Sequence, residues 1–104
     1  MTETLQRVAT LHPEPGKQGV RIDARKYEVM RRALLRVIPA RAPGAAFGDL
    51  CDFVRPLLPD DVYGEGTSVP WYVVTVKLDL EARGVLRRLP GRGPQRLVRR
   101  KVHP

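Results

Sequence analysis

The chain has 104 residues, of which 42% are hydrophobic, and this size and composition fit one small domain with its own core. Its net charge of +8 favours an anionic partner, with nucleic acid the expected one. A membrane-spanning helix needs an apolar run of ~18 residues, which the sequence lacks, and its N-terminus has no signal-peptide core. The single cysteine, Cys51, excludes an internal disulfide. We therefore expect a cytoplasmic protein.

The first 22 residues show the features of an extended segment. Leu5, Val8 and Leu11 are separated by polar residues, and Val20–Ile22 alternates as a strand does. Pro13–Gly16 lies between them and is a strong turn signal. Residues 1–22 are expected either to pair as a β-hairpin, about 5–12 with 18–22, or to remain a loose arm. Residues 23–104 are expected to form the main domain.

Two helices are expected next. Asp23 is a good N-cap for a helix from about Ala24 to Ile38, and Pro39 ends that helix. Its apolar face repeats with the helical period and comprises Tyr27, Met30, Leu34 and Val37. After the loop 40–44, a second helix is expected from about Phe47 to Arg55, before Pro56. Its apolar stripe comprises Phe47, Leu50, Cys51, Val54 and Leu58.

The last third of the chain predicts a helix and two strands. Ser68 is a favourable N-cap, and Pro70 is tolerated in the first turn of a helix. Gly84 is the expected left-handed residue that ends this third helix. Val85–Leu89 and Gln95–Val102 are expected strands, joined by a turn at residues 90–94 that is rich in Gly and Pro.

Three helices followed by a hairpin resemble the winged helix-turn-helix superfamily. The resemblance covers about residues 24–102 and is carried by Phe47–Leu50, which opens the second helix, and Val76–Leu86, which closes the third. More narrowly, WYVVTVKLDLEARG and the later PQRL resemble a family of small bacterial winged-helix proteins of unknown function. The resemblance implies an α+β fold of three helices and a C-terminal β-hairpin wing. Here an extra N-terminal β element precedes it.

Positive charge is concentrated in two regions. Residues 84–104 hold seven basic and no acidic side chains, and residues 23–45 hold six basic and two acidic ones. Residues 46–83 hold three basic and seven acidic ones. Because basic side chains bind the phosphates of double-stranded DNA, the candidate contacts are Arg87, Arg88, Arg92, Arg96, Arg99, Arg100, Lys101 and, on the third helix, Lys77. The alternative is a solvated hairpin that arginine keeps soluble.

The third helix is less suited to reading bases. Its apolar residues form two rows, one a natural core face and the other made of Trp71, Val74, Leu78 and Ala82. No Asn or Gln is present, and Asp79 and Glu81 are expected to repel phosphates. We therefore expect mainly a core or interface helix. Trp71, Val74 and Leu78 form a candidate packing or dimer face, covered by the N-terminal hairpin or by a second copy.

No pattern in the sequence indicates an enzyme, a metal site or a cofactor. The acids Asp60, Asp61 and Glu65 lack calcium-loop spacing, and His12 and His103 have no nearby Cys or His at metal-ligand spacing. We expect a small nucleic-acid-binding protein, such as a transcriptional regulator of weak sequence specificity. The alternative is a non-enzymatic protein–protein interaction module, or a homodimer, that does not bind DNA.

Overall fold

Two short strands open the part of the chain, residues 6–101, that the computed structural model describes. β1 (Arg7–Ala9) and β2 (Arg21–Asp23) are antiparallel, with Val8 opposite Ile22. The Thr10 hydroxyl extends this pairing, because it donates to the Val20 carbonyl and accepts from the Val20 amide, each at 2.8 Å. Of the two forms expected for residues 1–22, the described part adopts the hairpin. Leu5 lies outside the described residues.

The first helix begins and ends close to where the sequence predicts. α1 spans Ala24–Val37, and the Asp23 carboxylate caps it by accepting from the amides of Arg25 at 2.7 Å and Lys26 at 3.1 Å. Met30 and Leu34 on the predicted apolar face are completely buried. Both contribute to the hydrophobic core between α1 and α3.

The predicted second helix is divided into three short pieces. β3 (Ala45–Ala46) is followed by the 3₁₀ turn η1 (Phe47–Asp49), α2 (Leu50–Val54) and the 3₁₀ turn η2 (Arg55–Leu57). No side chain caps η1, and Pro56 cannot donate a backbone hydrogen bond within η2. The prediction of one continuous helix over residues 47–55 is therefore wrong in detail. Its inner face is right, because Leu50 and Val54 are completely buried.

The third helix, α3 (Val69–Ala82), has the predicted ends. The Ser68 hydroxyl accepts from the Trp71 amide at 3.2 Å, and Gly84 has a φ of 75° after the last turn. β4 (Leu86–Arg88) and β5 (Arg96–Arg99) follow and pair in antiparallel fashion. Both strands are shorter than predicted, and Val102, the predicted end of the second, lies outside the described residues.

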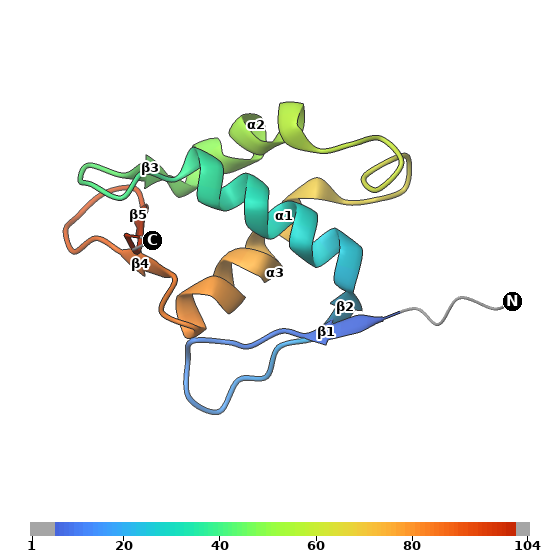
Figure 1. Ribbon diagram of the computed structural model, residues 1–104. Coiled ribbons are helices and arrows are strands. Elements are labelled where there is room, and N and C mark those ends of the chain that lie inside the picture. The colour runs from blue at the N-terminus through green and yellow to red at the C-terminus, as the bar shows by residue number, and fades with distance from the viewer. Residues whose placement is uncertain (1–5, 102–104) are drawn as a thin grey trace, which may run out of the picture.

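β5 is the central strand of a small antiparallel sheet with the order β3–β5–β4. Figure 1 shows this sheet at one end of the molecule, with the β1–β2 pair near the N-terminal end of α1. β3 can approach β5 because Gly44 has a φ of 70° and no side chain, and a Cβ atom there would lie 2.2 Å from the Leu97 carbonyl oxygen. Residues 6–101 thus form an α+β fold with three α-helices and two antiparallel sheets.

The longest helices of residues 6–101 are α1 and α3, with 14 residues each. Neither they nor any other helix in this part of the chain is long and apolar enough to cross a membrane.

Candidate nucleic-acid interface

The basic side chains predicted to contact phosphates have very different surroundings. Apart from Lys77 and Arg88, which are described below, five of them are exposed on β4, on β5, in the turn between these strands or directly after β5, and Arg99 is half-buried. None of these six has a carboxylate within ion-pair distance among residues 6–101; they are Arg87, Arg92, Arg96, Arg99, Arg100 and Lys101. The cations are held by a rigid frame, because the amides of Arg99 and Arg100 donate to the carbonyls of Pro39 and Val85 at 3.0 and 2.8 Å.

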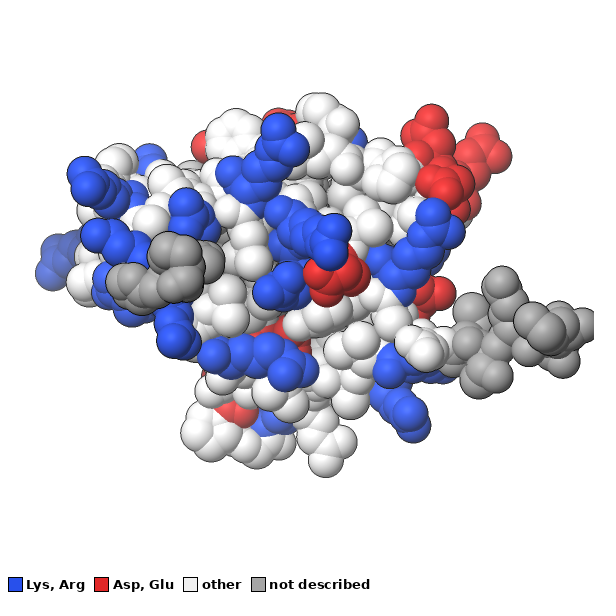
Figure 2. Space-filling view, in the orientation of Figure 1, with Lys and Arg blue, Asp and Glu red and all other residues white. Residues whose placement is uncertain are grey.

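Four of these cations line one pocket of about 280 Å³. Its walls come from Ala40 in the α1–β3 connection, the turn after α3, the two strands and the residues after β5, and its cations are Arg87, Arg99, Arg100 and Lys101. Figure 2 shows Lys and Arg gathered over this end of the molecule and along α1, with an acidic group at the opposite end. Because these four cations lie close together without a carboxylate, they repel one another, and a bound anion would reduce this electrostatic repulsion.

Lys77 does not belong to this surface, and its assignment as a phosphate contact is wrong. It is only 2% exposed, and its ammonium bonds the Glu81 carboxylate and the Gln95 side-chain oxygen at 2.9 Å each. The same ammonium lies 4.9 Å from the centre of the Phe47 ring. Burial lowers the pKa of Lys77, and the hydrogen bond and charge of Glu81 act in the opposite direction. Lys77 instead fixes the position of the sheet against α3.

Arg88 also forms an ion pair within the chain. Its guanidinium bonds the Glu81 carboxylate, and this hydrogen bond is the main reason that the pKa of Arg88 is raised. Lys77, Glu81 and Arg88 therefore form one charged cluster that joins α3 to β4. Arg88 keeps an exposed side chain, but its charge is shared with Glu81, which makes it a weaker candidate contact than its neighbours.

The two acids of α3 that were expected to repel phosphates do not face solvent. The Glu81 side chain is 7% exposed, and Asp79 is completely buried. Asp79 accepts hydrogen bonds from the Leu11 amide at 2.9 Å, the Tyr27 hydroxyl and the Arg83 guanidinium at 3.0 Å. Burial, followed by the bond to Asp79, raises the pKa of Tyr27 to about 12. Asp79 thus connects α3, α1 and the N-terminal strand pair.

The outer face of α3 is apolar and partly covered. Trp71 is 46% and Val74 39% exposed, whereas Leu78 is half-buried beside the N-terminal hairpin. Leu11 and Val20 of that hairpin are each 45% exposed and line a small pocket together with Trp71 and Leu78. The N-terminal hairpin therefore covers part of the predicted packing face. The remainder stays apolar and offers no Lys, Arg, Asn or Gln side chain to a DNA base.

The arginines of α1 are largely used in ion pairs. Arg25 bonds Asp61 at 2.8 Å, and the Glu28 carboxylate receives both Arg31 at 3.2 Å and Arg32 at 3.0 Å. These pairs are exposed, so each contributes little to stability. Arg25 joins α1 to the loop of residues 60–65, in which the paired acid Asp61 remains 65% exposed.

Two ion pairs of α3 could have been predicted from the spacing of their residues in the sequence. Lys77 and Glu81, like Asp79 and Arg83, are separated by four residues on one helix, the spacing at which side chains meet. The burial of Lys77, Glu81 and Asp79 had no such signal, because it depends on the hairpin and the sheet packing over them. His103 lies outside the described residues, and within 6–101 no three His, Cys, Asp or Glu side chains are grouped to hold a metal ion.

Comparison with known proteins places the chain in a family without giving it an activity. No curated protein and no solved structure matches it. A family described as a family of unknown function, DUF6958, matches residues 7–97, which include the N-terminal strand pair, all three helices, β4 and the first half of β5. Because the match covers most of its length, the chain belongs to the family of unknown function DUF6958.

Proposed function

We propose that this protein has a winged helix-turn-helix architecture and binds the phosphates of double-stranded DNA through β4, β5 and the turn between them. Two features support the architecture. The helices and strands after β2 follow the order α1–β3–α2–α3–β4–β5, and β5 lies between β3 and β4. In such a fold the hairpin after the third helix is the wing, which contacts the DNA backbone beside the helix. Here the wing comprises residues 86–101, which are the two strands, the turn between them and the two residues that follow β5.

The six cations without a carboxylate partner among residues 6–101 carry the proposal of DNA binding. Four of them surround one pocket, and Arg92 lies at the tip of the wing between Gly91 and Gly93. Phosphate contacts hold a protein on DNA without reading its sequence. The apolar outer face of α3 is consistent with binding of this kind, in which base recognition is weak or absent.

The salt dependence of binding to a short DNA duplex tests this proposal. Replacing Arg99 and Arg100 with Gln is expected to weaken binding. The plot of the logarithm of the association constant against the logarithm of the salt concentration should also become less steep by about 2, or roughly 0.9 for each lost phosphate contact. The matched control replaces Arg25 and Arg32 with Gln, which removes the same charge from ion pairs on α1. Absence of binding at ~50 mM salt, or equal slopes for the two double variants, would contradict the proposal.

A second candidate function is protein–protein interaction through the outer face of α3. Residues 6–101 have five exposed large hydrophobic side chains, and four of them support this candidate because they lie on α3 or the N-terminal hairpin. These four are Leu11, Val20, Trp71 and Val74. Apolar side chains that gather on a surface often mark an interaction site.

The fluorescence of Trp71 tests this second candidate directly, because Trp71 is the only tryptophan of the chain. If the outer face of α3 binds a second copy or another protein, the emission shifts to the blue and quenching by acrylamide decreases when the complex forms. DNA binding through the wing leaves both quantities unchanged. An emission spectrum that never responds to protein concentration or to cell extract would remove the support for this candidate.

A further inference from the structure

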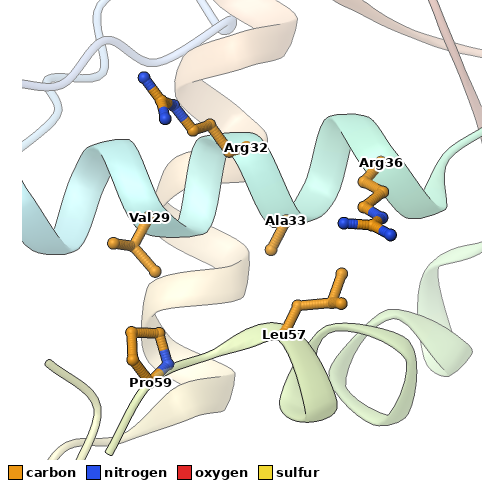
Figure 3. Close-up of a pocket in the computed structure, with 6 residues that line it drawn as sticks. All are labelled: Val29, Arg32, Ala33, Arg36, Leu57 and Pro59. Carbon is orange, nitrogen blue, oxygen red and sulfur yellow. The ribbon is translucent and has the colours of Figure 1, made fainter. Parts of the chain in front are cut away.

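A shallow groove of about 300 Å³ lies between α1 and η2. Figure 3 shows Val29 and Ala33 of α1 facing Leu57 and Pro59, which form an apolar floor. The guanidinium of Arg36 lies over the Leu57 end of this floor, whereas the Arg32 side chain points away from it. The groove therefore has an apolar floor with a cation at one end.

Arg36 differs from the other arginines of α1 in its partners. Arg25, Arg31 and Arg32 each bond a carboxylate, but Arg36 has none within ion-pair distance among residues 6–101. It also follows Arg32 by four residues, a spacing at which two like charges slightly destabilise a helix. Arg36 lies in the last turn of α1, where a cation is favourable for the helix, but its guanidinium still has no carboxylate partner among residues 6–101. A binding partner that places an apolar group on the groove floor and a carboxylate beside it would form an ion pair with the Arg36 guanidinium.

The same side of the chain's second helical region presents that chemistry. Phe53 on α2 is 46% exposed, and it lies between the groove residue Leu57 and the acid Asp49, four residues from each. Asp52 adjoins Phe53, and both acids are exposed without a Lys or Arg partner among residues 6–101. An aromatic ring beside two carboxylates is complementary to an apolar floor beside a guanidinium.

We infer that two copies of this chain pair through α1 and α2, with Phe53 of each copy in the groove of the other. Arg36 of one copy then meets Asp49 and Asp52 of the second. α2 runs directly into η2, so the exposed ring of Phe53 and the groove residue Leu57 come from adjoining segments of the chain. A surface that carries both complementary parts can close on its own copy about a two-fold axis.

The apolar face of α3 is less suited to a second copy. The pocket beside Trp71 is lined by apolar and uncharged polar residues and by His12, without any Asp, Glu, Lys or Arg. It therefore lacks paired charges that would fix the register of two identical surfaces. The contacts of this pairing, Arg36, Asp49, Asp52 and Phe53, lie outside the wing.

The mass in solution, measured by light scattering and sedimentation up to about 100 µM so that a weak dimer is also detected, tests the inference. The wild-type chain is expected to approach the mass of two chains and to dissociate on dilution. Phe53→Ser and Arg36→Glu are each expected to remain single chains with an unchanged circular dichroism spectrum. The control variants Arg41→Glu, with the same charge change, and Trp71→Ser are expected to dimerise as the wild type does.

A charge exchange gives the sharpest test. Arg36→Glu and the double variant Asp49→Arg with Asp52→Arg are each expected to be monomers, because like charges then face each other across the two-fold axis. An equimolar mixture is expected to dimerise, since every facing pair is again opposite in sign.

Three results would overturn the inference: a wild-type chain that is monomeric throughout, a dimer that survives Phe53→Ser and Arg36→Glu, or a folded mixture that does not associate. Loss of the dimer in Trp71→Ser would also overturn it and assign the contact to α3. The outcome is separable from DNA binding, because monomeric Phe53→Ser retains all the wing cations and its salt slope can be measured alone.

Discussion

Asp79 is the acid whose removal should destabilise the fold most. Asp79→Ala leaves the Tyr27 hydroxyl and the Leu11 amide without an acceptor and frees the Arg83 guanidinium. A buried polar group left unsatisfied costs about 1–3 kcal/mol, and Tyr27 is the more buried of the two donors. Arg83 adds little, because its side chain is 40% exposed and water replaces its partner. The expected loss is therefore about 3 kcal/mol of the free energy of unfolding.

Urea and thermal unfolding followed by circular dichroism measure this loss, which corresponds to a fall of about 15 °C in Tm for a domain of this size. The control is Asp61→Ala, which breaks an exposed ion pair with Arg25 and is expected to cost less than about 0.5 kcal/mol. Hydrogen exchange in Asp79→Ala should also accelerate at the Leu11 amide. Equal losses of stability in the two variants would refute the view that Asp79 holds the N-terminal hairpin onto α3.

Three further predictions concern backbone space and titration. Gly44→Ala is expected to lower Tm strongly or prevent folding, because its Cβ would lie 2.2 Å from the Leu97 carbonyl oxygen, whereas Gly48→Ala, with nothing within 4 Å, should change Tm little. Stability is expected to fall as pH rises from about 10 toward 12, because folded Tyr27 keeps a proton that the unfolded chain has lost; Tyr27→Phe should reduce this fall in urea unfolding. Lys77 is expected to have the opposite effect, because its pKa is lowered and the unfolded chain therefore binds more protons just below pH 10.5. The wild type should then gain stability relative to Lys77→Met as pH rises through that range. A difference in unfolding free energy between the two that does not change with pH would contradict the burial of the Lys77 charge as the cause.

Local signals in the sequence were sufficient for the two long helices. Asp23 and Pro39 bracket α1, Ser68 and Gly84 bracket α3, and the apolar period identifies the buried faces. These features act within a few residues of the backbone, so they are visible without the fold. α2 was predicted less well: its apolar stripe is correct, but it begins only at Leu50, because the uncapped residues Phe47–Asp49 form the 3₁₀ turn η1.

The sequence by itself determined how many cations follow Gly84, and the absence of acids among them. Only the tertiary structure decided which charges are available: Lys77 is buried, Arg88 is paired with Glu81, and four other cations surround one pocket. It also decided β3, because Ala45–Ala46 carries no local strand signal and pairs only where β5 supplies its partner. A helix satisfies its hydrogen bonds within its own segment, whereas a strand, a buried ion pair and a charged pocket need groups brought together from distant positions in the chain.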